Sequence, residues 1–222
     1  MASTFFGLHI GSSALSSFQV ATNTTANNIA NVKTTGYTRQ EATLQAKDAI
    51  NVTARYGSVG TGVTVTSIKQ QRDLYYDNKY WENNSCYGRY EQKLYYMEQI
   101  QNYFKDNGSS VKGFSSVFSQ MFSDLDTLRS KPSDKTVRNQ FISSAQSLCT
   151  YFNQMSDNLS KLQDDCNEEI RNNVDKINSI SEKISLLNKE INQIETGTGV
   201  EAGSLRDERA NLIDSLSKIV NV

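Results

Sequence analysis

The side chains best suited to chemistry in this sequence are a group of carboxylates, one imidazole and three thiols. The carboxylates form two pairs at i, i+4 spacing, which on a helix could present oxygen ligands to a divalent cation. They are Asp164, Asp165, Glu168 and Glu169. Because an apolar stripe runs along the other side of the same helical stretch, the pattern favours a solvated acidic face. The sequence therefore predicts no metal site.

Nucleophilic catalysis needs a base close to its nucleophile, and the only histidine, His9, lies in a stretch with no charged residue before Lys33. The widely spaced Cys86, Cys149 and Cys166 match neither a metal-site pattern nor a disulfide framework. They also lack the basic neighbours that activate a thiolate, and Cys166 falls on an apolar stripe, as a small buried hydrophobe would. We predict no catalytic residue, no bound cofactor and no enzymatic activity.

The composition points to long paired helices. Hydrophobic residues are 37 % and there is one proline, Pro132; narrow helical stripes need fewer apolar residues than a thick core. Charged residues are 21 % with a net charge of -1, which favours neither nucleic acid nor an anionic membrane. No apolar window is long enough for membrane insertion, and the N-terminal stretch lacks the basic and continuous apolar regions of a cleaved signal.

Apolar spacing predicts helices over residues 3–31, 72–106, 114–128, 133–196 and 204–220. The first carries a sparse seven-residue pattern made of Leu8, Gly11, Leu15, Phe18, Thr22, Thr25 and Ile29. This seam is too weak to hold a helix alone, so we expect it to become ordered by packing on other helices. Leu8, Leu15, Phe18 and Ile29 are the predicted assembly contacts.

The second helix carries an aromatic row at three-four spacing. Its members are Tyr87, Tyr90, Leu94, Met97 and Phe104. Such a row could stack nucleic-acid bases, but the flanking charge is mixed and no basic strip follows it. Packing in a core or an interface is the favoured interpretation. Asp106, Asn107 and Gly108 are expected to end this helix.

Residues 38–70 change to the period of half-buried strands. Ala42, Leu44 and Ala46 alternate with polar residues, and Val63 and Val65 do the same. The intervening GSVGTG, residues 57–62, lacks the Lys-Ser/Thr and the helix of a phosphate-binding loop, so it predicts a strand reversal.

The longest predicted helix, 133–196, contains no glycine or proline. If unbroken it would span about 95 Å at 1.5 Å per residue, and a break near Asp157-Asn158 is the alternative. Ser133 or Asp134 can cap its start. Residues 196–199, TGTG, are expected to form a loop into the last helix, with Ser204 as its cap.

These elements predict a mainly α fold in which long antiparallel helices form a coiled-coil-like bundle, with a small β-hairpin region near residues 38–70. We expect an N-terminal helix with its signature over residues 1–35 and a long-helix rod domain over residues 36–222.

Residues 26–40, ANNIANVKTTGYTRQ, join the first helix to the strands. Asparagines suit a helix end, and glycine suits a chain reversal. The string resembles the N-terminal signature of bacterial flagellar axial proteins, and its Thr38-Arg39-Gln40 ending resembles the hook-associated protein 1 branch. By this resemblance the signature residues fix the turn from an inner-tube helix into an outer helical layer. They are Asn27, Asn28, Asn31, Gly36, Tyr37 and Arg39.

The resemblance continues through QRD at 71–73, PSDKTVRNQF at 132–141 and LRDERANLIDSLSKIVNV at 205–222. It implies a structural subunit joining hook to filament, exported through the flagellar channel to an extracellular position without a cleaved signal. The implied partners are other copies of itself, the hook protein, a second junction protein and an export chaperone. Family members also have outer domains and a C-terminal helix that pairs with the N-terminal helix, and the resemblance implies that these 222 residues lack both.

Two other functions stay open from the sequence. The chain could be another axial protein, such as a hook, rod or second junction subunit. It could instead be a secreted coiled-coil effector or adhesin.

Overall fold

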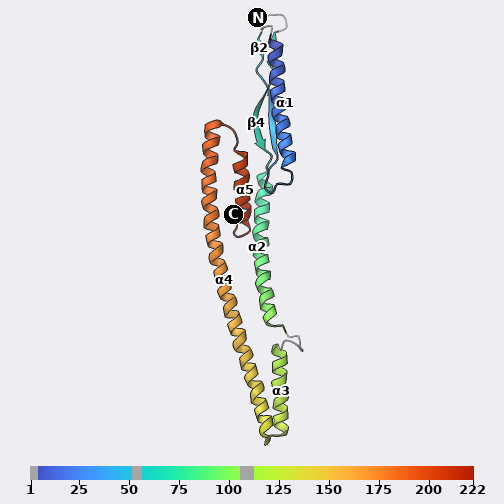
Figure 1. The fold of residues 1–222 in the computed structure, drawn as a ribbon, viewed down its shortest axis with the longest axis vertical. Coiled ribbons are helices and arrows are strands. Elements are labelled where there is room, and N and C mark those ends of the chain that lie inside the picture. The colour runs from blue at the N-terminus through green and yellow to red at the C-terminus, as the bar shows by residue number, and fades with distance from the viewer. Residues whose placement is uncertain (1–4, 52–56, 106–112) are drawn as a thin grey trace. The chain divides into compact units, whose positions relative to one another are not determined.

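The computed structural model describes residues 5–51, 57–105 and 113–222, and these ranges contain five helices and four strands (Figure 1). In chain order they are α1 (Phe6–Ala30), β1 (Gln40–Ala46), β2 (Ile50–Asn51), β3 (Ser58–Val59), β4 (Val63–Gln70), α2 (Leu74–Tyr103), α3 (Phe114–Ser130), α4 (Lys135–Thr198) and α5 (Gly203–Ser217). The predicted mainly α fold with a small antiparallel strand region is confirmed. The chain divides into two compact units, one of Met1–Ser85 with Ile177–Val222 and the other of Cys86–Lys176.

In the first unit a strand pair lies along α1 (Figure 1). β1 pairs antiparallel with β4, with Ala42 opposite Ile68 and Leu44 opposite Val65. The register shifts between Thr43 and Leu44, as it does at a β-bulge. β2 pairs antiparallel with β3 inside the loop that joins the two longer strands. The reversal predicted at residues 57–62 was misplaced, because Ser58–Val59 already form the returning strand β3.

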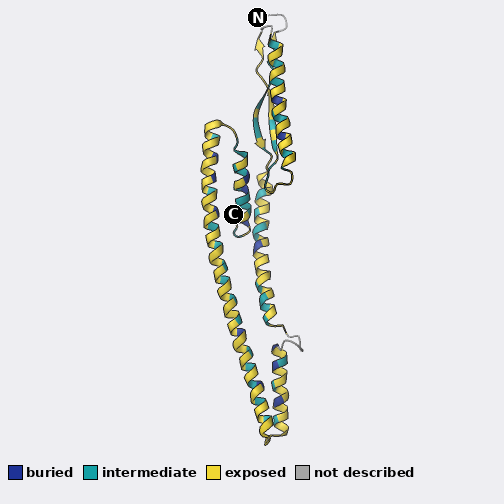
Figure 2. Ribbon diagram, in the orientation of Figure 1, coloured by how far each residue is buried: buried dark blue, intermediate teal, exposed yellow. Residues whose placement is uncertain are grey.

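The same unit contains the hairpin of α4 and α5. Ile180, Leu187 and Ile191 on α4 and Ala210 on α5 are buried, which gives the hairpin a narrow apolar seam. Figure 2 shows that α5 is buried or half-buried along most of its length. Helix α5 is therefore the best covered helix of this unit.

In the second unit α3 packs antiparallel to α4 (Figure 1). Phe114 stacks on Phe118 with ring centroids 5.1 Å apart, and it also approaches Phe152 of α4 at 5.9 Å. Val117 on α3 and Met155 on α4 are buried in this contact. The aromatic end of α3 thus holds the two helices together.

Helix α4 is one helix of 64 residues, without a break at Asp157-Asn158. It begins after Pro132, and its first turn is capped by Asp134, as predicted. The Oδ1 of Asp134 accepts a hydrogen bond from the backbone N–H of Thr136 at 2.8 Å. Among the described residues, no helix combines the length and apolar character that crossing a membrane requires.

Two other local predictions were wrong. The expected TGTG loop is mostly helix, because α4 continues to Thr198 and ends only at Gly199, which has a φ of 69°. Ser204 does not cap α5; Ala202 occupies the cap position without a side-chain hydrogen bond. The expected helix end at Asp106, Asn107 and Gly108 lies outside the described residues.

Candidate assembly interface

Helix α1 has two chemically different faces. The predicted assembly contacts share the outward face, where Leu8 is 69 % exposed, Leu15 71 %, Phe18 58 % and Ile29 69 %. The structure thus brings these four side chains together on one uncovered strip, which we call the α1 ridge: Leu8, Leu15, Phe18 and Ile29. A strip of this kind on a helix is the usual contact surface of another helix.

The inward face of α1 is built from small polar residues. Ser17 and Thr24 are buried, and the Ser17 hydroxyl donates to the carbonyl of Val63 at 3.2 Å. Gly62 has a φ of 107°, and a Cβ there would lie 2.2 Å from the Oγ of Ser13. The strands therefore approach α1 closely over hydroxyls and glycine, and the large apolar side chains are left facing outward.

Asn28 joins the end of α1 to the start of β1. Its Nδ2 donates to the carbonyl of Gln40 at 2.8 Å, and its Oδ1 accepts from the backbone N–H of Gln40 at 2.9 Å. The same Oδ1 accepts from the Tyr37 hydroxyl at 2.8 Å. One amide thus pairs with Gln40 as a neighbouring strand would, and this fixes the angle at which the chain leaves the helix.

The neighbouring signature residues support this turn. The Asn27 amide donates to the Tyr37 hydroxyl at 3.2 Å. Asn31 donates to the carbonyl of Asn27 at 3.0 Å and accepts from the Thr34 hydroxyl at 3.1 Å. Arg39 is exposed. The structure therefore brings Asn27, Asn28, Asn31 and Tyr37 into one hydrogen-bonded network.

Helix α5 holds the turn from the other side. Gly36 has a φ of 78°, and a Cβ there would lie 1.8 Å from the Oδ1 of Asn211, so glycine is required both for the backbone conformation and for the approach of α5. The buried Asp207 accepts from the backbone N–H of Thr38 at 3.3 Å and from the Gln70 amide at 2.8 Å. One carboxylate thus connects the turn to the end of β4.

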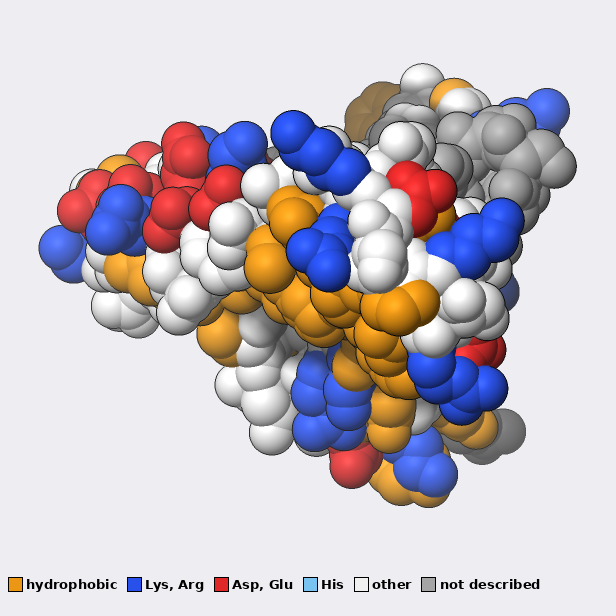
Figure 3. All heavy atoms as spheres, turned by 90° about the horizontal axis from the view of Figure 1, so that it is seen from below, with side chains coloured by type: hydrophobic (Ala, Val, Ile, Leu, Met, Phe, Trp, Pro, Cys, Tyr) orange, Lys and Arg blue, Asp and Glu red, His pale blue; other side chains and the backbone are white. Residues whose placement is uncertain are grey.

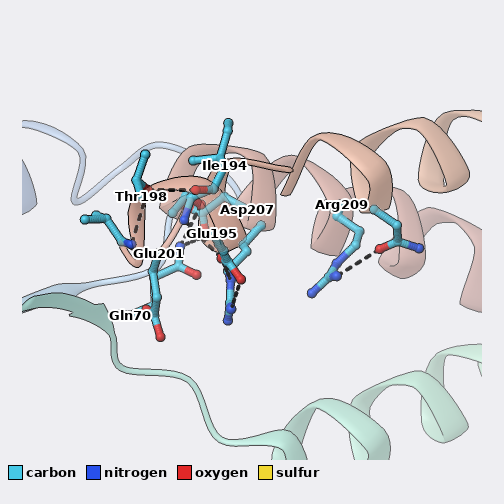
Figure 4. Close-up of polar contacts among 12 residues, drawn as sticks. Gln70, Ile194, Glu195, Thr198, Glu201, Asp207 and Arg209 are labelled. Carbon is cyan, nitrogen blue, oxygen red and sulfur yellow. Dashed lines mark hydrogen bonds and ion pairs between the residues drawn. The ribbon is translucent and has the colours of Figure 1, made fainter. Parts of the chain in front are cut away.

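Glu195 fixes the start of α5 to the end of α4 (Figure 4). Its Oε1 accepts from Arg206 Nε at 2.7 Å and from the backbone N–H of Ala202 at 3.1 Å, and its Oε2 accepts from Arg206 Nη2 at 2.8 Å. These hydrogen bonds, led by the one from Arg206, lower the pKa of Glu195 to about 2. Further along, Arg209 donates to the Asn188 side chain at 2.9 Å.

The other end of α5 is attached to α2. The Trp81 indole donates to Asp214 Oδ1 at 2.6 Å. The Asn84 amide donates to the carbonyl of Asp214 at 3.0 Å and to the hydroxyl of Ser217, which is fully buried, at 2.8 Å. Polar contacts between segments far apart in the sequence thus join α5 to α2, in addition to the apolar seam between α4 and α5.

A groove of about 640 Å³ lies beside the α1 ridge. It is formed by the last turns of α1 and by residues 37–42, and Ile29, Val32 and Arg39 line it. Ile29 and Val32 are exposed there. The ridge, the signature turn and this groove form one continuous surface with both apolar and cationic groups.

The residues considered for chemistry are scattered. His9, Cys86 and Cys149 are exposed and Cys166 is half-buried. Of the acidic group, Glu169 turns towards α2 and accepts a hydrogen bond from the hydroxyl of Tyr96, which raises the pKa of that phenol. Within the described ranges no group of three or more histidine, cysteine or acidic residues is placed to hold a metal ion.

Sequence reasoning missed the residues of α5 that hold the turn, namely Gly203, Asp207 and Asn211. A Cβ at Gly203 would lie 2.9 Å from the Gln40 amide. These contacts join residues separated by more than 130 positions, and no spacing rule signals them.

A protein-family model described as the flagellar hook-associated protein FlgK helical domain matches residues 97–222, more than half of the chain. The chain belongs to the FlgK family of flagellar hook-associated proteins. A second model, described as a flagella basal body rod protein, matches residues 8–38. That range contains the whole α1 ridge and all predicted signature residues except Arg39. The predicted resemblance is confirmed.

Individual relatives cover nearly all of this FlgK-family chain. Flagellar hook-associated protein 1 of Bacillus subtilis is 34 % identical over 227 residues, which is 100 % of this chain and 44 % of that protein. The proteins of the same name from Salmonella typhimurium and Escherichia coli are 32 % and 30 % identical, and the matches cover 95 % of this chain and 37 % and 38 % of those proteins. The chain therefore spans less than half the length of these relatives.

Proposed function

We propose that this chain is the axial part of a structural subunit that joins the flagellar hook to the filament. The observation that carries the proposal is the α1 ridge, an apolar strip left uncovered on a helix whose other face is fixed by polar contacts. The relatives named flagellar hook-associated protein 1 support the same assignment. The partners are other copies of the chain, the hook protein and a second junction protein, and an export chaperone accompanies it before assembly.

The free energy of burying the α1 ridge can be compared with the cost of association. Fully burying a Leu, Ile or Phe side chain is worth about 1.5–3 kcal/mol, so the four ridge residues at their present exposure offer about 4–8 kcal/mol. Association itself costs about 4–15 kcal/mol, which equals or exceeds the gain that one ridge supplies. The ridge of a single subunit is therefore not enough by itself, and a tube adds contacts with further neighbours.

The signature turn has a separate role in this proposal. Asn28 and Gly36 fix how the strands and α5 follow α1, and therefore the direction in which the rest of the subunit leaves an inner tube. The subunit works outside the cell, reaches that place through the flagellar export channel without a cleaved signal, and catalyses no reaction.

The test places Leu15→Asp and Phe18→Asp in the protein expressed by its own bacterium. Each variant should remain helical by circular dichroism but fail to enter hook–filament junctions, leaving hooks without filaments in electron micrographs. Asn23→Asp is the matched control, because Asn23 is exposed on α1 away from the ridge and should tolerate the same charge.

Normal junctions built from both ridge variants would contradict the proposal. So would labelled wild-type protein that is found in the rod or free in the medium and never at the filament base.

A further inference from the structure

Helix α3, in the second unit, carries an exposed apolar strip that the proposed role of α1 does not use. We call it the α3 strip, and its members are Phe114, Phe118, Phe122 and Leu125. They are 38–47 % exposed, and Phe152 of α4, which approaches Phe114, is 52 % exposed. Figure 3 views the molecule from the end at which α3 meets α4, and it shows hydrophobic side chains at the surface beside Lys and Arg side chains.

The strip lies to one side of the buried face of α3. The buried residues of this helix are Val117 and Asp124. Phe118 and Leu125 each follow one of them directly, and one residue turns a helix by about 100°. The strip therefore runs along the edge of the pair formed by α3 and α4.

The aromatic rings of the strip pack on one another along the helix. Phe114 stacks on Phe118 with centroids 5.1 Å apart, and Phe118 meets Phe122 edge-on at 4.7 Å. Spacings of four, four and three residues keep the members on one face over about three turns. A straight apolar row of this kind matches the apolar face of another helix.

The end of the strip next to the α3–α4 turn is cationic. Residues 126–138 contain four cationic side chains and two carboxylates, a local net charge of +2 in a chain whose net charge is -1. Arg129 lies one helical turn after Leu125, and both it and Arg138, at the start of α4, are exposed. Within the described ranges neither arginine forms an ion pair, and Arg138 donates to the carbonyl of Pro132 at 2.8 Å.

The charge pattern distinguishes between possible occupants. If two copies packed strip to strip in parallel, their cationic ends would meet. If they packed antiparallel, each cationic end would face residues 113–120, which contain no charged residue. A helix that lies on a membrane surface has a polar face rich in lysine and arginine, whereas α3 has one arginine and two aspartates. The complementary occupant is a helix with acidic residues at one end.

We propose that the α3 strip binds an amphipathic helix of a different protein, whose acidic residues meet the cationic end beside the α3–α4 turn. The apolar face of that helix covers the phenylalanine rings, and its carboxylates pair with Arg129 and Arg138. The site lies wholly within the second unit. It therefore requires neither the α1 ridge nor the proposed role at the junction.

The first test measures binding of two labelled synthetic peptides to the 222-residue chain by fluorescence anisotropy, in a Leu15→Asp background that disables the α1 ridge. Each peptide has about 18 residues, enough to span the strip, with leucine at its a and d positions. The acidic probe ends in glutamates and the basic probe in lysines. The acidic probe should bind over tens of micromolar.

Phe122→Ser should weaken binding of the acidic probe about tenfold, because it removes an aromatic ring from the middle of the strip. Leu186→Ser on α4 is the matched control, since Leu186 is 58 % exposed and Phe122 47 %. This control should leave the affinity unchanged.

The second test reverses a charge. Arg129→Glu should weaken binding of the acidic probe about fivefold and strengthen binding of the basic probe, because it changes the sign of a charge at the end of the strip. Arg171→Glu makes the same charge change at an exposed position further along α4, and it should affect neither probe.

Failure of the acidic probe to bind, or equal affinity for the two probes, would overturn the proposal. So would a dimer in sedimentation velocity that Phe122→Ser abolishes, because a second copy would then be the occupant. Binding to phosphatidylglycerol vesicles that Phe122→Ser abolishes would also overturn it, in favour of a lipid surface. Each of these results leaves the proposed function intact, because that function is tested by the α1 variants.

Discussion

Replacing Gly36 with alanine should destabilise the first unit by about 1.5–3.5 kcal/mol. A non-glycine residue at the observed φ of 78° costs about 1–2 kcal/mol. The added Cβ would also lie 1.8 Å from Asn211 Oδ1. Because that atom is at the end of a flexible side chain, moving it adds only about 0.5–1.5 kcal/mol, the cost of leaving a preferred rotamer.

Urea unfolding followed by fluorescence measures this change, because the single tryptophan, Trp81, donates a hydrogen bond to α5 and reports on the first unit. Asn211→Ala in the Gly36→Ala background should recover the steric part and leave about 1–2 kcal/mol of backbone strain. Gly199→Ala is the matched control, because Gly199 has a φ of 69° with open space around its Cβ position. It should cost about 1–2 kcal/mol by itself. The close approach of α5 would be refuted if the Gly36→Ala protein were as stable as wild type. It would also be refuted if the Gly36→Ala, Asn211→Ala double variant had a lower free energy of unfolding than Gly36→Ala alone.

Two further substitutions and one control test the polar contacts. Asn28→Ala removes both hydrogen bonds to Gln40 and should lower the free energy of unfolding by about 1–3 kcal/mol. Hydrogen exchange at the backbone amide of Gln40 should become faster. Asn27→Ala is the control: its hydrogen bonds are exposed, so it should change the free energy of unfolding by less than about 1 kcal/mol. Glu195→Gln should cost about 1 kcal/mol at pH 7, since the ion pair with Arg206 is partly exposed and screened. The depressed pKa of Glu195 stabilises the fold above about pH 4.5, and this contribution is lost as the pH falls towards 2. The difference between wild type and the Gln variant should therefore shrink over that range in acid-unfolding curves, and a constant difference would contradict the ion pair.

The sequence predicts the elements well because each is specified by its own spacing. Three-four periodicity over α4 and period two in β1 and β4 need no knowledge of what lies opposite. The helix ends depend on backbone contacts instead. Gly203 begins α5 where the side chain of Gln40 passes close to it, and no capping rule covers that situation.

Spacing also failed to indicate which side of α2 is covered. It identified the row through Tyr87 and Leu94 as the face to be packed, but α2 contacts its own unit through Trp81 and Asn84 in one part and Tyr96 in the other. Apolar periodicity shows that a face can be buried. It does not show whether the partner belongs to the same molecule.

The same distinction explains the chemistry of the first unit. The hydrogen bonds that Asn28 donates and Asp207 accepts, and the ion pair of Glu195, are formed within one molecule, and each depends on direction and distance. The apolar ridge of α1 stays exposed within the described chain, and burial of apolar area has little directional preference. Polar contacts can therefore fix the first unit before the proposed assembly, while the apolar α1 ridge remains exposed for contacts with neighbours. In the proposed assembly, polar contacts such as those of Asn28 set the geometry and the ridge sets the affinity. Substitutions at the two places should therefore separate misdirected assembly from absent assembly.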